Sequence, residues 1–310
     1  MARDRSLALS FGTNVTDYER GRPGYPDAAV EWMLAQATPG SSPSDTEPAP
    51  APAAATTGSF PSETEPASAS AAAAAPNGSP RPDIEPSRTS SAPGGTAPSP
   101  LRVVDVGAGT GKFTASLVAR GLDVTAVEPD DVMRAGLERN FGTVTAVRGT
   151  GESMPLPDGS ADLVTFAQSW HWVDVERASR EVARVLAPAG AVALVWNIRD
   201  QSVDWVRRLG EIMGSSAAED YDTLTPSLGA PLETVEHAQF FWDNPMTREQ
   251  LLAMVSSRSY IIALEPDERT ALLGRIERLL DEHPQLAAHD TYVMPYETRV
   301  TLARRPAALS

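Results

Sequence analysis

Residues 103–113 read Val-Val-Asp-Val-Gly-Ala-Gly-Thr-Gly-Lys-Phe, and this stretch decides the fold. A short β-branched apolar run ends in glycines, and a helical pattern opens directly after them. Glycines at the carboxyl end of a strand let the backbone approach a ligand closely. The stretch therefore predicts a strand, a ligand-binding loop and a helix at the edge of a parallel sheet.

Three kinds of ligand loop compete for this stretch. A phosphate-binding Walker loop is excluded, because Val106 stands where its first glycine is required and Phe113 where its hydroxyl is required. A dinucleotide loop, Gly-x-Gly-x-x-Gly, is weakened because its third position is Lys112, although it stays open. The pattern acid-x-Gly-x-Gly-x-Gly is satisfied at every position.

Two acidic residues at strand ends favour this third pattern. Asp105 precedes the glycines, and a carboxylate there suits a ligand with an ammonium group better than a pyrophosphate. Glu128 ends the next predicted strand, where a carboxylate can accept hydrogen bonds from two ribose hydroxyls. An amino acid joined to a ribose describes S-adenosylmethionine.

Apolar strand patterns alternate with helical patterns from residue 101 onward. Strands are predicted at 101–106, 123–127, 143–147, 161–167 and 191–197, the last preceded by a turn at 188–190. Helices are predicted at 112–120, 130–139 and 174–186, and further helices at 203–213, 247–255 and 266–282. Apolar strands separated by helices indicate a doubly wound, parallel α/β sheet. The segments 236–242 and 291–303 read as additional strands.

The composition divides the chain into parts. Residues 38–100 hold 14 of the 27 prolines, and their large apolar residues are Phe60 and Ile84. Such a tract cannot bury enough apolar surface to offset the entropy of ordering it, so we expect a disordered Ala/Pro/Ser-rich insertion. The rest is expected to be one domain, with 1–37 as an N-terminal cover segment and helix, 101–200 as the cofactor-binding core, and 201–310 completing the sheet and the substrate side.

Charge and cysteine content exclude several classes of function. The net charge of −15 argues against a non-specific binder of nucleic acid or of an anionic membrane. The chain has no cysteine, which excludes disulfides, thiolate zinc sites and cysteine nucleophiles, and its four histidines show no metal-ligand spacing. We therefore expect a cytoplasmic protein without a metal and without a nucleic-acid or membrane partner.

Several stretches resemble the class I S-adenosylmethionine-dependent methyltransferases of the small-molecule, type 11 kind. These are VDVGAGTGKFT, VTAVEPDDVM, GTGESMPLPDGSADLV and EVARVLAPAGAVALV, in this order within residues 103–195. The opening FGTNVTDYERGRPGYP, with AQSWHWVD and WNIR, is similar to a branch that includes trans-aconitate methyltransferase-like proteins. The resemblance implies a mostly parallel seven-stranded sheet with an antiparallel last strand, and methyl transfer to a small molecule, with oxygen as the expected acceptor.

The resemblance also implies roles for single residues around the cofactor. The methionine part would be held by Asp105 and by the backbone of Gly107, Ala108, Gly109 and Gly111. Glu128 would hold the ribose, Met133 would pack on the adenine, and Gly151 and Glu152 would lie beside the adenine amino group. Ala167 and Gln168 would lie near the sulfonium. In the alternative interpretation Asp105 only caps a turn, Glu128 and Glu152 are solvated acids, and Met133 is an ordinary core residue.

Fewer sequence features point to the residues that would contact the methyl acceptor. His171 is a candidate general base, because its reference pKa lies near neutrality, or else a packed wall residue. Trp170 and Trp172 are candidates for the substrate wall, with the hydrophobic core as the alternative. The N-terminal segment offers three further candidate substrate residues, which are Tyr18, Arg22 and Tyr25. The guanidinium of Arg22 could clamp a carboxylate or form an ion pair with a local acid.

Two other functions stay open at this point. A non-catalytic S-adenosylmethionine-binding protein would use the same acids without an acceptor pocket. A nicotinamide-dependent oxidoreductase would use a dinucleotide loop, against which the position of the third glycine counts.

Overall fold

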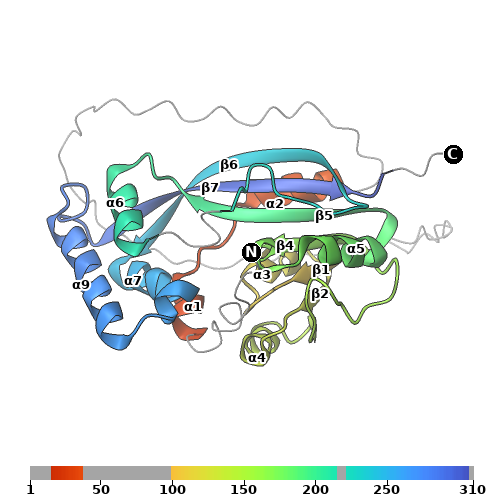
Figure 1. Ribbon diagram of the computed structural model, residues 1–310, viewed down its shortest axis with the longest axis horizontal. Helices are drawn as coiled ribbons and strands as arrows, with labels where there is room; N and C mark the ends of the chain where they lie inside the picture. The colour runs from red at the N-terminus through yellow and green to blue at the C-terminus, as the bar shows by residue number, and fades with distance from the viewer. Residues whose placement is uncertain (1–14, 38–98, 215–220, 307–310) are drawn as a thin grey trace, which may run out of the picture. The chain divides into compact units, whose positions relative to one another are not determined.

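The computed structural model describes residues 15–37, 99–214 and 221–306. Within these residues seven strands form one sheet in the order β3-β2-β1-β4-β5-β7-β6 (Figure 1). The strands are β1 Arg102–Val106, β2 Asp123–Val127, β3 Thr145–Val147, β4 Ala161–Ala167, β5 Leu186–Arg199, β6 Glu233–Thr247 and β7 Thr291–Arg304. The first five strands pair in parallel, and β7 runs antiparallel to both β5 and β6. The predicted doubly wound, mostly parallel sheet with an antiparallel last strand is confirmed.

Helices cover both faces of the sheet. They are α1 Val15–Gly21, α2 Asp27–Ala37, α3 Lys112–Val118, α4 Asp131–Asn140, α5 Val175–Val185, α6 Asp204–Met213, α7 Arg248–Ser256, α8 Ser259–Ile262 and α9 Pro266–Glu282, together with the 3₁₀ helix η3 Trp170–Trp172. Apolar side chains of α5 pack with Val104, Val164 and Leu194 on one face. Those of α2 and α3 pack on the other face with Val103 and Leu163, the alternate residues of the same strands. None of the helices in the described ranges combines the length and the apolar character needed to cross a membrane.

The boundary between α5 and β5 differs from the prediction. A turn was expected at residues 188–190, but β5 begins at Leu186. Ala161 pairs with Leu186 and Leu163 with Ala191, so residues 187–190 bulge opposite the single residue Asp162. The proline and glycine of this segment are therefore accommodated as an irregularity at the start of the strand, which agrees with the places where sheets tolerate these residues.

Local capping explains several helix starts. Asp130 caps α4 by accepting hydrogen bonds from the backbone N–H groups of Val132 and Met133. Asp174 caps α5, and Thr247 with Gln250 forms a capping box at α7. These short polar contacts fix the positions at which the chain leaves the sheet edge.

A second apolar cluster lies beyond the parallel part of the sheet. It joins α6, α7 and α9 to Met246 of β6 and to Met294 of β7. The short helix α1 packs against α7, and Gly21 makes this contact possible, because a Cβ there would lie 2.0 Å from the backbone nitrogen of Met254 (Figure 1). No pattern in the sequence indicates α1, α8 or η3. The insertion predicted at 38–100 falls outside the described residues except for 99 and 100, and the domain boundaries stay predictions.

Candidate active site

The glycine loop follows the carboxyl end of β1, between the neighbouring strands β2 and β4. Gly107, Gly109 and Gly111 all have positive φ, at 69°, 59° and 95°. A Cβ on Gly107 would lie 2.6 Å from the Cβ of Ser169, in the turn after β4. Glycine is required there both for the backbone conformation and for this close approach. The loop thus lies at the switch point of the sheet, where ligands of α/β proteins bind.

Asp105 lies beneath this loop and is 1% exposed. Its Oδ2 accepts a hydrogen bond of 2.7 Å from the Thr114 hydroxyl of α3, and its Oδ1 accepts one of 3.0 Å from the Thr165 hydroxyl of β4. Burial raises the pKa of Asp105 to about 6, although the two hydroxyls oppose the rise. The carboxylate is thus a positioned buried acceptor, and the backbone N–H of Thr114 in the first turn of α3 also acts on it, which agrees with the capping interpretation.

Glu128 follows β2 and is 6% exposed. Its Oε2 accepts the backbone N–H of Gly109 at 2.8 Å, and its Oε1 accepts that of Asp130 at 2.9 Å. Burial raises the pKa of Glu128 to about 7, against the lowering effect of both N–H groups. Glu128 is therefore not a solvated surface acid. A carboxylate offers about four acceptor sites, so these two bonds leave capacity for ligand hydroxyls.

Helix α1 covers the glycine loop. The Tyr18 hydroxyl would lie 3.2 Å from a Cβ placed on Gly109. The guanidinium of Arg22 lies over the Tyr18 ring at 5.1 Å and donates hydrogen bonds to the hydroxyl and carbonyl oxygens of Ser257. Tyr25 packs edge-on against Phe113 of α3, with ring centroids 4.8 Å apart. Tyr18 and Arg22 thus lie together over the loop, whereas Tyr25 belongs to the adjoining apolar cluster.

Charges of both signs act on Tyr18. Burial is the main reason that its pKa is raised, and the carboxylates of Glu128 and Asp105 add to the rise, while the guanidinium groups of Arg22 and Arg258 oppose it. The acids come from the ends of β2 and β1. Arg22 directly follows α1, and Arg258 lies in the turn between α7 and α8. Sequence reasoning missed Arg258, because it lies in the region without a recognised motif.

The turn after β4 holds a strained residue. Gln168 has φ +58°, the one positive φ among the non-glycine residues that the structure describes. Its side-chain Nε2 donates to the backbone oxygen of Asn197 at 2.9 Å, and the Ser169 hydroxyl donates to the backbone oxygen of Val106 at 2.6 Å. Such backbone strain persists only where the surroundings enforce it, and it is concentrated at functional sites. Ala167 and Gln168 thus lie at the switch point of the sheet, and their place near the sulfonium stays a prediction.

The aromatic segment after this turn corrects one prediction. Trp170 is fully buried, packs edge-on against Phe166 at 4.7 Å, and donates its indole N–H to the backbone oxygen of Ser227 at 3.0 Å. It is a core residue and not part of a substrate wall. His171 is also buried, with ring centroids 4.9 Å from Trp172 and 6.5 Å from Tyr221. Trp172 is half-buried and remains a wall candidate.

The residues expected beside the adenine also take different places, in the core or in a loop. Met133 is 2% exposed, which matches its alternative interpretation as core. The Oε1 of Glu152 accepts the backbone N–H of Asp174 at 2.7 Å and so ties its loop to the start of α5. A Cβ on Gly151 would lie 2.8 Å from a Val173 methyl group. Glu152 and Gly151 therefore shape the loop that borders the site.

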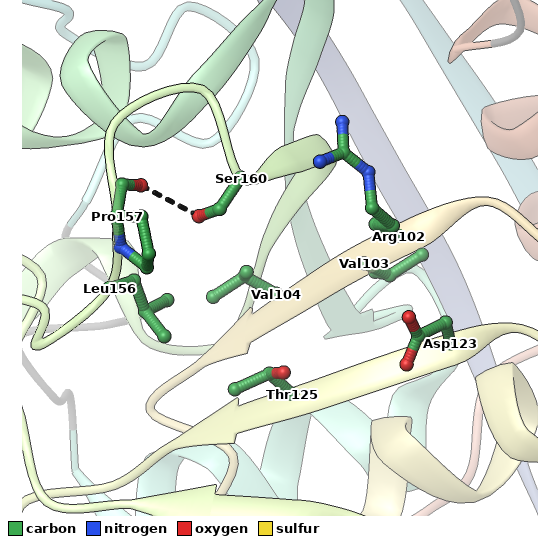
Figure 2. A pocket seen from close by; sticks show the side chains of 8 residues that line it. All are labelled: Arg102, Val103, Val104, Asp123, Thr125, Leu156, Pro157 and Ser160. Atoms are coloured by element: carbon green, nitrogen blue, oxygen red, sulfur yellow. Dashed lines mark hydrogen bonds between the residues drawn. The ribbon is translucent and has the colours of Figure 1, made fainter.

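A separate pocket lies at the other end of the strands. A cavity of about 180 Å³ lies against the sheet face that carries Val104 and Thr125. Figure 2 shows the side chains that line it. It is bordered by Arg102 and Asp123, the first residues of β1 and β2, whereas the glycine loop follows the last residue of β1. The pocket shares no residue with the predicted site. Among the described residues, no group of three His, Asp or Glu side chains is placed to hold a metal ion.

Comparison with known proteins identifies the family. A family model described as a methyltransferase domain matches residues 104–194. An uncharacterized methyltransferase of Mycobacterium tuberculosis (strain ATCC 25618 / H37Rv) is 40% identical over 306 residues, which cover 96% of this chain and 98% of the relative. The chain belongs to the methyltransferase family. A methyltransferase-like protein of Schizosaccharomyces pombe is 30% identical over 204 residues, which cover 63% of this chain and 79% of that relative.

The fold of this methyltransferase agrees with a solved structure. A type II methyltransferase structure from Anaeromyxobacter dehalogenans superimposes with a TM-score of 0.52 at 22% identity, covering 67% of this chain and 91% of that chain. Together with the family match, the sheet confirms the predicted class I, S-adenosylmethionine-dependent methyltransferase. The resemblance to trans-aconitate methyltransferase-like proteins stays a prediction.

Proposed function

We propose that this methyltransferase transfers a methyl group from S-adenosylmethionine to an oxygen of a small anionic molecule, such as a carboxylate. The observation that carries the proposal is the position of Tyr18, whose hydroxyl lies close to Gly109 of the glycine loop and whose ring lies beneath the guanidinium of Arg22. Buried carboxylates from the ends of β1 and β2 suit a cationic cofactor. The guanidinium groups of Arg22, directly after α1, and of Arg258, in the α7–α8 turn, suit an anionic acceptor, which Arg can hold through two parallel hydrogen bonds.

The donor set fits S-adenosylmethionine. When bound, the cofactor supplies an activated methyl group on a positively charged sulfur. Asp105 would face its ammonium group, Glu128 would accept from its ribose hydroxyls, and the loop from Gly107 to Gly111 admits the close backbone approach. Both carboxylates are buried, so their attraction for a cation is weakly screened.

The protein's own part in such a transfer is alignment and exclusion of water. Arg22 and Arg258 would orient the anion, and α1 would cover the reacting groups, which strengthens the attraction between opposite charges. A carboxylate acceptor is already deprotonated near neutral pH and needs no general base. That agrees with the burial of His171, the one candidate base. The net charge of −15 supports a small molecule rather than a nucleic acid as acceptor.

The proposal is tested with methyl-labelled S-adenosylmethionine and a metabolite extract separated into acidic, neutral and basic fractions. We expect labelled product from the acidic fraction, released again by mild base because it is a methyl ester. Arg258→Gln should lower the yield, while Arg180→Gln, on the exposed side of α5, should not.

Other outcomes would overturn the proposal. A base-stable product from the neutral fraction would contradict a carboxylate acceptor. Tight binding of S-adenosylhomocysteine with no product from any fraction would favour the non-catalytic binder. Saturable NAD binding without S-adenosylhomocysteine binding would favour the oxidoreductase.

A further inference from the structure

One buried amide joins the N-terminal cover to the end of β5. Asn197 is 7% exposed, and its Nδ2 donates a hydrogen bond of 2.9 Å to the backbone oxygen of Gly24, in the linker between α1 and α2. Its Oδ1 accepts one of 2.6 Å from the Thr298 hydroxyl of β7. This amide thus connects the linker that carries α1 to two central strands.

The neighbouring strand fixes the orientation of this amide. The indole N–H of Trp242, on β6, donates to the Thr298 hydroxyl oxygen at 2.8 Å. An indole nitrogen can only donate, so the Thr298 oxygen accepts there and its own proton is directed to Asn197. The Asn197 oxygen is therefore the acceptor, and its nitrogen faces Gly24. The oxygen and nitrogen of a side-chain amide are otherwise hard to tell apart. The two hydrogen bonds of the Thr298 hydroxyl therefore determine that the amide nitrogen of Asn197 bonds the N-terminal cover.

The same residue holds the strained turn at the switch point. The backbone oxygen of Asn197 accepts from the side chain of Gln168, whose φ is +58°. The backbone N–H of Gln168 donates to Val195, two residues earlier on β5. Gln168 lies next to Ser169, which contacts Gly107 of the glycine loop. Asn197 is therefore bonded on its side chain to the cover and on its backbone to the turn beside the glycine loop.

We propose that Asn197 is a positioning residue for methyl transfer, which sets the cover and the Gln168 turn in one mutual geometry. The cover carries Tyr18 and Arg22, and the turn borders the glycine loop. Misplacement of reacting groups by about 1 Å can cost two orders of magnitude in rate, so a shared anchor matters for an in-line transfer. The inference rests on the proposed function in one respect, which is that the methyl acceptor lies between the cover and the Gln168 turn.

The test is hydrogen–deuterium exchange on the full chain, with Thr298→Val and Thr298→Ser as a matched pair. Valine keeps the shape of threonine but removes the hydroxyl that orients Asn197, whereas serine keeps the hydroxyl. We expect Thr298→Val to speed exchange about tenfold in peptides covering residues 15–26, because an opening equilibrium there loses about one net hydrogen bond. Peptides covering residues 166–172 should also exchange faster, because the Asn197 backbone that accepts from Gln168 shifts once its side chain is no longer held. Thr298→Ser should exchange like the parent, and peptides from α5 should be unchanged in both variants.

Asn197→Leu is the second variant, because it removes both side-chain bonds at similar volume. It should speed exchange in the same two segments, as Thr298→Val does. Faster exchange in only one segment, or equally in α5, would reduce Asn197 to a local or a general structural role and overturn the proposal. The exchange needs no acceptor, so its failure is distinguishable from failure to find a methylated product.

Discussion

Glu128 and Gly109 are joined by a hydrogen bond of 2.8 Å, from the backbone N–H at the middle of the glycine loop to the carboxylate that follows β2. Through this bond one side chain both shapes the loop and offers its remaining acceptor capacity to a ligand. Because the carboxylate is 6% exposed, a change of its charge or shape is poorly compensated by water. The glycine loop and the Glu128 carboxylate are thus held together as one unit.

Replacement of Glu128 is expected to weaken cofactor binding. Glu128→Ala should cost about 1–3 kcal/mol of affinity for S-adenosylhomocysteine, because charge-assisted hydrogen bonds to the ribose are lost. Calorimetric titration measures the change, and Glu138→Ala, on the exposed surface of α4, is the matched control. Equal affinity in the parent and Glu128→Ala would remove the ribose assignment.

Cofactor affinity should rise with pH. Burial raises the pKa of Asp105 from 3.8 to about 6 and that of Glu128 from 4.5 to about 7. Because the folded chain holds these protons more tightly than the unfolded chain, both groups contribute stability below their ordinary pKa values, which is lost as pH rises through about 6 and 7. A ligand whose ammonium group faces Asp105 and whose ribose hydroxyls donate to Glu128 favours the charged forms of both acids, so it should restore stability in that range.

The measurement is the increase in melting temperature caused by S-adenosylhomocysteine, recorded from about pH 5 to about pH 8. We expect the increase to grow with pH and to flatten in Glu128→Gln, which cannot ionise. A ligand-induced increase that is constant over this range would show that neither carboxylate changes its ionisation on binding.

The contact between α1 and α7 should depend on Gly21. A Cβ on Gly21 would lie 2.0 Å from the Met254 backbone nitrogen, whereas one on Gly24 would meet nothing within 4 Å. Gly21→Ala should therefore cost about 1–3 kcal/mol of stability or detach α1, as overpacking does in other cores. Chemical denaturation and proteolysis at α1 measure the effect, with Gly24→Ala as the control. Indistinguishable variants would mean that α1 does not hold this position.

Removal of residues 41–98 should leave cofactor binding intact. The tract's composition cannot supply a core, while α2 packs its Val30 and Met33 into the apolar cluster beneath the sheet. The melting temperature and S-adenosylhomocysteine affinity of the shortened chain should match those of the parent. A large loss of either would mean that the tract is part of the folded unit.

The alternating strands and helices of this fold can be predicted well from the sequence, because the spacing of the apolar residues differs between a strand and a helix. β4 at Ala161–Ala167 and α9 at Pro266–Glu282 lie where the pattern places them. Helix α1 escapes prediction because a seven-residue helix is marginal by itself and is stabilised by tertiary packing on α7. Such packing involves residues more than two hundred positions away.

The candidate site also contains residues that can be predicted from the sequence and residues whose positions depend on tertiary contacts. Asp105, Glu128 and the glycines follow strands, so their position at the sheet edge can be predicted from strand order alone. The threonines that hold Asp105, and Asn197 with its partners, depend on which side chains meet across strands. Trp170 shows the limit most directly, because its burial is completed by Ser227, in a segment without regular structure.

Trp170 and Trp172 should therefore differ sharply in stability. Trp170→Phe loses the hydrogen bond to Ser227 and leaves a cavity beside Phe166, so it should cost about 1–3 kcal/mol in urea denaturation. Trp172→Phe, at a half-buried position, should cost less than roughly 1 kcal/mol and act instead on turnover if it borders the acceptor. Equal losses of stability would place both indoles in the core. A stable Trp170→Phe with impaired turnover would restore Trp170 to the substrate wall, because only contact with the acceptor would then account for the defect.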